Sequence, residues 1–128
     1  MVDLRLALPN RPGALLQALD VIAQAGVSVE AACGDIRPGE RWGYLHVLLD
    51  ELEPANSALG KAGFEVLSTH DVEIREVGDQ PGALAELIRE FADAGRNLEV
   101  IYTSSRGVVL GTEDMLTERF GVKMGGPE

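Results

Sequence analysis

A repeat at an offset of 69 residues constrains the fold of this chain more than any other feature of its sequence. Residues 10–33 read NRPGALLQALDVIAQAGVSVEAAC and residues 79–102 read DQPGALAELIREFADAGRNLEVIY, so eight of the 24 aligned positions are identical. Self-similarity at a fixed offset indicates repeated structural units. We therefore expect two copies of one small unit, which divide the 128 residues into 1–70 and 71–128.

Each copy is small for a unit that folds alone. A unit of this length buries only about 60% of the surface that its unfolded chain exposes, so it is marginally stable by itself. No stretch rich in Pro, Gly and Ser separates the copies, and apolar residues alternate through the seam at 64–77. We expect the copies to be joined strand to strand, which leaves them little freedom to move apart and lets each cover surface of the other.

The first copy has the pattern of a βαββαβ unit. Apolar residues alternate from Val2 to Leu8, which predicts a half-buried strand. A helix is expected from Pro12, which suits a first helical turn, to a stop at Gly26. Its predicted buried stripe is Leu15, Leu19 and Ile22. The other expected elements are strands at 27–36 and 42–49 around a turn at 37–40, a helix at 54–62 and a strand at 64–69.

The second copy repeats this order in a shorter length. A strand at 72–77 precedes a helix that starts at Pro81 and stops at Gly95, with Leu84, Ile88 and Phe91 as its predicted stripe. A tight hairpin follows, with strands at 98–104 and 107–110. Thr112 is predicted to cap a last helix over 113–120, whose acidic first turn suits the helix dipole. Only 122–124 are left for a final strand, so the second unit is expected to be truncated.

These patterns predict an α+β protein with antiparallel sheets and helices on one face of each. The opposite face of each sheet must then be solvated or covered by another element. We interpret Trp42 and Tyr44 as packing residues of the sheet, and His46 in the same strand as a hydrogen-bonded sheet residue. Cys33 is expected to be a buried packing residue, and His70 at the seam is expected to be solvated.

Composition excludes several classes of function. The formal net charge of −10 opposes non-specific binding to nucleic acid and to anionic lipid, and we predict neither partner. Cys33 is the only cysteine, so neither an intramolecular disulfide nor a thiolate zinc cluster can form. No apolar run is long enough to span a membrane, and the N-terminal residues lack the pattern of a signal peptide. The cytoplasm is the expected location, and no metal or cofactor is implied.

The element common to both copies resembles the ACT domain, a ligand-binding module with a ferredoxin-like βαββαβ fold. It reads Asn10-Arg11-Pro12-Gly13-Ala14-Leu15 with Gly26-Val27-Ser28, and Asp79-Gln80-Pro81-Gly82-Ala83-Leu84 with Gly95-Arg96-Asn97. The resemblance spans nearly the whole chain and implies two such units in tandem. It also implies that the protein binds an amino acid and regulates an enzyme, with no catalytic residue of its own. Homodimer formation is expected.

The resemblance places the ligand where the first loop of one module faces another module. The implied contacts are the polar residues Asn10, Ser28, Asp79 and Asn97, and glycines that let the backbone approach the ligand. The full set of expected binding residues is Asn10, Arg11, Pro12, Gly13, Ala14, Leu15, Ser28, Asp79, Gln80, Pro81, Gly82, Ala83 and Asn97. We favour the Asn10 loop, completed by Asn97 from the other unit, because an ionised Asp79 repels a ligand carboxylate.

The chemistry of this motif favours a zwitterionic ligand independently of the family resemblance. A helix N-terminus presents unpaired N–H groups and the positive end of a dipole, which suit a carboxylate. A neighbouring side-chain oxygen can accept a hydrogen bond from an ammonium group, so the two together form a receptor for a zwitterion. The structural alternative is that Asn10 and Asp79 cap their helices and bind no ligand.

Two other functions remain open at the level of sequence. One is a protein–protein assembly module that uses the open sheet face and binds no ligand. The other is a small ferredoxin-like enzyme that acts on acyl phosphates, for which Arg11 beside Asn10 is the only hint.

Overall fold

The first antiparallel sheet is built from the alternating strands of the first copy. The structure of the chain is a computed structural model, and it describes residues 1–119. The four strands lie in the order β2-β3-β1-β4, which is the order of a ferredoxin-like unit. They are β1 (Val2–Pro9), β2 (Val29–Asp35), β3 (Trp42–Leu49) and β4 (Glu65–Asp71).

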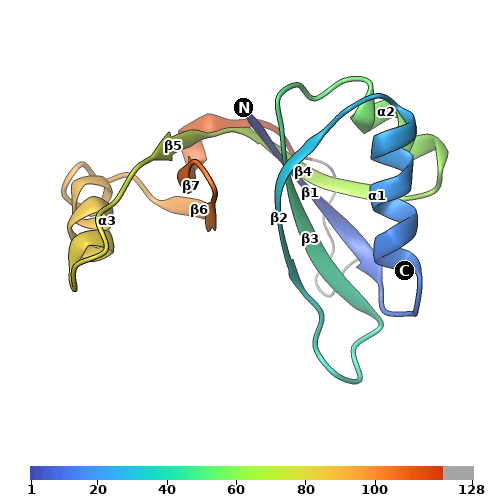
Figure 1. The fold of residues 1–128 in the computed structure, drawn as a ribbon, viewed down its shortest axis with the longest axis horizontal. Coiled ribbons are helices and arrows are strands. Elements are labelled where there is room, and N and C mark those ends of the chain that lie inside the picture. The colour runs from blue at the N-terminus through green and yellow to red at the C-terminus, as the bar shows by residue number, and fades with distance from the viewer. Residues whose placement is uncertain (120–128) are drawn as a thin grey trace.

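Two helices, α1 (Ala14–Gln24) and α2 (Ala55–Lys61), cover one face of this sheet (Figure 1). The predicted stripe of α1 is confirmed at Ile22 and wrong at Leu15, because the helix buries Ala14, Ala18 and Ile22 and leaves Leu15 45% exposed. Alanines at a spacing of four residues form a flat face, which can lie close to the leucine-rich sheet. No helix among residues 1–119 is long and apolar enough to cross a membrane.

The second sheet contains three strands in the order β5-β7-β6, with one helix on its outer face. Leu87 and Phe91 of the helix pack on Val108 and Leu110, whereas Leu84 of the predicted stripe is 43% exposed. The elements are β5 (Glu73–Arg75), α3 (Ala83–Asp93), β6 (Leu98–Ser104) and β7 (Gly107–Thr112). Only Val72 separates β4 from β5, which confirms the expected strand-to-strand junction.

The helix predicted at 113–120 is wrong. The chain instead forms a single 3-10 turn, η1 (Glu113–Met115), and then β8 (Leu116–Arg119), which pairs with β4 in the first sheet. A bond between the hydroxyls of Thr69 and Thr117 (2.7 Å) reinforces this pairing. The open edge of β4 thus supplies backbone partners that outweigh a short helix. The strand predicted at 122–124 lies outside the described residues.

The two sheets meet on the face of the first sheet that carries no helix. Val100, Tyr102 and Val109 of the second sheet pack on Leu48 of the first. The two sheets therefore lie between their helices, and α1 and α3 lie at opposite ends of the molecule (Figure 1). Each unit covers part of the other, as its small size requires.

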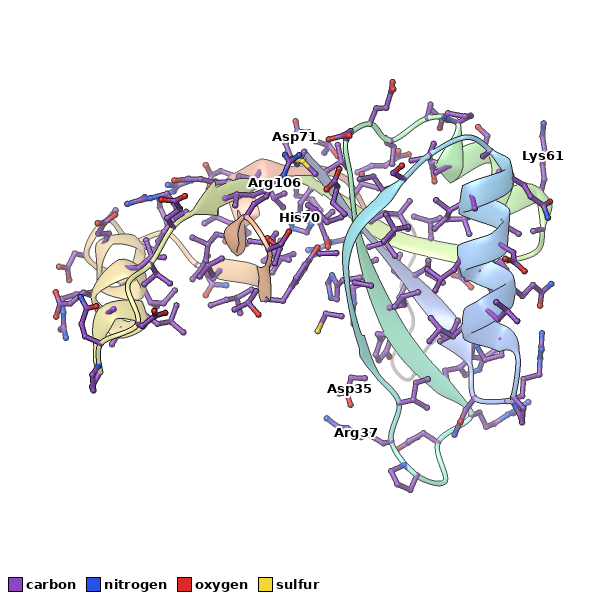
Figure 2. All side chains as sticks on the ribbon, in the orientation of Figure 1. Asp35, Arg37, Lys61, His70, Asp71 and Arg106 are labelled. Atoms are coloured by element: carbon purple, nitrogen blue, oxygen red, sulfur yellow. The ribbon has the colours of Figure 1, made fainter. Side chains whose placement is uncertain are left out.

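Two polar clusters lie where the sheets meet. The Asp3 carboxylate is fully buried, faces the His46 Nδ1 at 2.9 Å and accepts a hydrogen bond from the Tyr102 hydroxyl at 2.7 Å. His70 is only 3% exposed and bonds through Nε2 to Glu99 of β6 at 2.9 Å (Figure 2). The expectation that His70 is solvated is therefore wrong, because β6 covers the seam. The prediction that His46 is a hydrogen-bonded sheet residue is confirmed.

We predict that Tyr102→Phe destabilises the fold by about 1.5–3 kcal/mol, because it removes a buried hydrogen bond to a charged carboxylate. The free energy of unfolding in urea measures this loss. Tyr44→Phe is the matched control, since the Tyr44 hydroxyl makes no hydrogen bond within residues 1–119, and its cost should stay below about 0.5 kcal/mol. Equal costs for the two variants would contradict the role given to the Asp3 cluster.

Tyr102 should also make the stability of the fold depend on pH. Burial, and then the charge of Asp3, raises the pKa of the Tyr102 phenol well above its ordinary value. Above pH of about 10 the phenol ionises in the unfolded chain but not in the folded one, so stability should fall as the pH rises further. Tyr102→Phe should remove this part of the decline.

Candidate ligand-binding site

The helix of each copy begins at a glycine and has no side-chain cap. Gly13 has φ 86° at the N-terminus of α1, and Gly82 has φ 88° at that of α3. Neither helix has a capping hydrogen bond from a side chain, so the capping interpretation of Asn10 and Asp79 is wrong. The Ala14 and Ala83 amides donate to backbone carbonyls, at 3.3 and 3.2 Å, and the next amides of each helix have no side-chain acceptor. These amides and the helix dipole favour an anionic group at this place.

Asn10 is fixed in the loop before α1 by two contacts with the turn between β2 and β3. Its backbone N–H donates to the Arg41 carbonyl at 2.9 Å, and its side-chain Nδ2 donates to the Glu40 carbonyl at 2.7 Å. The amide oxygen of the exposed side chain is then left to accept from another group. Arg11 is held in turn by a bond from its guanidinium to the Gln17 amide oxygen at 3.1 Å.

A cavity of about 240 Å³ lies beside this loop. Arg11 is the member of the predicted set that lines it, opposite the acidic Glu65. Sequence reasoning missed most of the wall, because the far residues come from the end of α2 and the start of β4, and no local pattern places them here. The lining residues are Ala7, Pro9, Arg11, Gln17, Trp42, Ala62, Gly63, Phe64 and Glu65.

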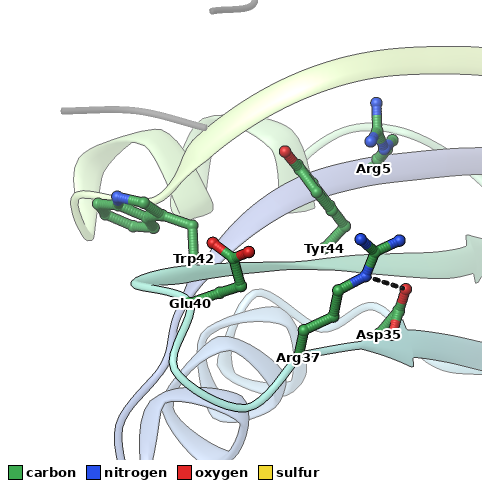
Figure 3. Close-up of a pocket in the computed structure, with 6 residues that line it drawn as sticks. All are labelled: Arg5, Asp35, Arg37, Glu40, Trp42 and Tyr44. Atoms are coloured by element: carbon green, nitrogen blue, oxygen red, sulfur yellow. Dashed lines mark ion pairs between the residues drawn. The ribbon is translucent and has the colours of Figure 1, made fainter. Parts of the chain in front are cut away.

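A second cavity, of about 390 Å³, lies on the other side of Trp42 on the open face of the first sheet (Figure 3). Trp42 and Tyr44 are only half-buried and form its aromatic wall, so the packing interpretation of these two residues is wrong. On its charged wall the Arg37 guanidinium lies 4.0 Å from the Asp35 carboxylate. The lining residues are Arg5, Asp35, Arg37, Glu40, Trp42 and Tyr44.

The remaining predicted residues are not gathered beside Asn10. Ser28 follows the other end of α1, and an 11-residue helix is about 16 Å long. Asn97 lies between α3 and β6 of the second unit, and its carbonyl accepts from the Glu113 amide. Asp79 is exposed, and the Gln80 side chain folds back over Gly78. One chain therefore does not place Asn97 next to Asn10.

Cys33 is exposed, which contradicts the expectation that it is a buried packing residue. It lies on β2, an edge strand, and lines a cavity together with Ile101 and Tyr102 of the second sheet. Within residues 1–119 no group of three His, Cys, Asp or Glu side chains is placed to hold a metal ion.

We predict opposite effects of Gly→Ala at two glycines that both have open space around a new Cβ. Gly13→Ala should destabilise the fold by about 1–2 kcal/mol, because Gly13 has a positive φ. Gly60→Ala, inside α2, should stabilise it by about 0.5–1 kcal/mol. Urea unfolding measures both changes, and a neutral Gly13→Ala would show that the left-handed turn before α1 is not required.

Solved structures of low sequence identity share this fold. A protein from Bacteroides thetaiotaomicron has a TM-score of 0.72 at 24% identity, over 89% of this chain and 80% of that chain. The ligand-free regulatory subunit of aspartate kinase from Thermus thermophilus has a TM-score of 0.66 at 20% identity, over 87% and 81% of the two chains. The same subunit from Thermus flavus has a TM-score of 0.63 at 18% identity, over 87% and 81%.

No family model matches the sequence, and no curated protein matches it. The similarity to known proteins therefore establishes the fold of this chain. The two antiparallel sheets, the three α-helices and the short second unit of residues 1–119 match the fold of the Bacteroides protein over 89% of this chain. The chain thus has the tandem ACT-type fold of two ferredoxin-like units that its repeated Pro-Gly-Ala-Leu element predicts.

Proposed function

We propose that this protein is a regulatory module that binds an amino acid, or a related small zwitterion, at the loop before α1. The observation that carries the proposal is an uncapped helix N-terminus beside a fixed asparagine and a cavity. The first-turn amides of α1 receive the carboxylate, and the free amide oxygen of Asn10 accepts from the ammonium group. Arg11 and Glu65 on the cavity wall contact polar side chains of the ligand.

The site is completed by a second copy of the chain. Because Asn10 and Ser28 lie at opposite ends of α1, two copies with antiparallel α1 helices bring Asn10 of one copy beside Ser28 of the other. Leu15 and Leu16 are 45% and 63% exposed on this helix and supply an apolar contact for such a pair. A ligand that binds only the paired arrangement stabilises it by its difference in affinity for the two states.

The regulated partner is an enzyme in this proposal. Two of the proteins that share the fold are described as regulatory subunits of aspartate kinase, which supports a regulatory role over a catalytic one. The acyl-phosphate alternative has Arg11 beside Asn10 as its only support. The assembly-module alternative predicts that no amino acid binds.

Binding is tested by thermal unfolding against the twenty amino acids. A ligand at 100 times its dissociation constant should add about 2.7 kcal/mol of stability. Asn10→Ala should weaken the affinity roughly tenfold, because it removes one hydrogen bond to a charged group. Arg89→Gln, an exposed change on α3 away from both ends of α1, is the control and should leave the affinity unchanged. Binding that is equal in Asn10→Ala, or absent for all twenty, would rule out this site.

The two-copy arrangement is tested by Leu16→Glu, which places a charge in the proposed apolar contact. We expect the wild-type protein to sediment as a dimer and the variant as a folded monomer that binds ligand poorly. The circular dichroism spectrum should not change, because Leu16 is exposed in a single chain. A variant that remains a dimer with full affinity would place the contact elsewhere.

A further inference from the structure

A polar row crosses all five strands of the first sheet on the face that carries no helix. Arg5 of β1 is paired with His46 of β3 and with Ser68 of β4. His46 is paired in turn with Cys33 of β2, and Ser68 with Arg119 of β8. Directly paired residues of antiparallel strands project from the same face of a sheet. The row therefore presents two guanidinium groups with a hydroxyl between them.

The row forms the floor of a cavity of about 330 Å³ at the boundary between the two sheets. Arg5 and Arg119 are separated by two strand spacings, which is roughly 10 Å between their backbones. Two long side chains at that separation can converge on one anion above Ser68. The lining residues are Arg5, His46, Ser68, His70, Glu99, Val100 and Arg119.

The carboxylates near this cavity are already bound by protein groups. Asp3 is held by His46 and Tyr102. Glu99 contacts His70 through one oxygen and Arg119 through the other, at 3.1 Å. These contacts keep both acidic groups from neutralising Arg5.

Arg5 is the arginine of this cavity that has no carboxylate partner among residues 1–119. It is half-buried, and no carboxylate within residues 1–119 lies within 4 Å of it. Its guanidinium lies 4.3 Å from the ring centre of Tyr44, which fixes its plane and leaves its N–H groups free (Figure 3). The same side chain lines three neighbouring cavities. In a chain with a net charge of −10, a half-buried arginine that has no carboxylate partner among residues 1–119 points to an external anion.

We propose that this cavity is a second small-molecule site, which binds the carboxylate or phosphate group of an anionic metabolite between Arg5, Ser68 and Arg119. Arginine suits such groups, because its planar fork makes two parallel hydrogen bonds to their oxygens. Val100 of β6 forms one wall of the cavity. Glu99 beside it is bonded to His70 and Arg119, so Arg119 offers the anion the guanidinium N–H groups that Glu99 does not use. The site is separate from the loop before α1 and does not depend on the function proposed for that loop.

The test is calorimetric titration of the full chain with inorganic phosphate and with succinate, at constant ionic strength set by sodium chloride. We expect saturable binding of at least one anion. Arg5→Gln should weaken its affinity tenfold or more, and Ser68→Ala should weaken it less. Arg89→Gln removes the same charge from an exposed pair with Glu86 on α3 and should change nothing.

Arg5→Lys is a second variant in case Arg5→Gln fails to fold. It keeps the positive charge and loses the planar guanidinium. We expect this variant to bind more weakly than the wild type and more tightly than Arg5→Gln. Wild-type affinity in a folded Arg5→Gln or Arg5→Lys variant, or no saturable binding of either anion, would overturn the proposal. The loop site is judged by titration with amino acids and this site by anion titration of the Arg5→Gln variant, so failure of one is distinguishable from failure of the other.

Discussion

The packing of β6 and β7 on the open face of the first sheet is the contact on which the rest of the molecule depends. A ferredoxin-like sheet covers only one of its faces with its own helices, and a unit of this size is too small to leave the other face bare. The second copy covers part of that face through Val100, Tyr102 and Val109. This contact buries Asp3 and His70 and gives each of them a partner on the opposite sheet or on a neighbouring strand. The uncovered part of the face holds the cavities around Arg5.

The return of the chain through β8 reinforces this arrangement. The strand leaves the second unit and joins the edge of β4, so the two units share one sheet as well as one interface. A swinging motion of one unit against the other would break backbone hydrogen bonds. Ligands that contact the boundary therefore act on the stability of the pair more readily than on its orientation.

The sequence was sufficient for those parts of the fold that local pattern decides. Alternation, the Pro-Gly-Ala-Leu element and the glycine stops predicted the order of elements in both units up to β7. The predicted stripes of α1 and α3 were wrong at Leu15 and Leu84, which are exposed. In α1 the reason is that alanine contributes little to an apolar pattern and yet faces the sheet. The end of the chain was wrong because the edge of β4, almost 50 residues away, decides the conformation of 116–119. Neither effect has a local signal.

The candidate site shows the same division between local and distant information. The loop, its glycine and the fixed Asn10 follow from the motif, whereas Trp42 and Glu65 join the cavity through tertiary packing alone. The row of Cys33, His46, Arg5, Ser68 and Arg119 depends on the register of five strands and could not be read before the sheet was known.

The central claim is that the first-turn amides of α1 receive a ligand carboxylate. Two-dimensional amide NMR of the uniformly labelled chain during titration with the bound amino acid tests it most directly. The account predicts saturable shifts of the amide protons at residues 13–16, together with the side-chain amide of Asn10. Shifts confined to the strands around Arg5, with residues 10–16 unmoved at saturation, would contradict it.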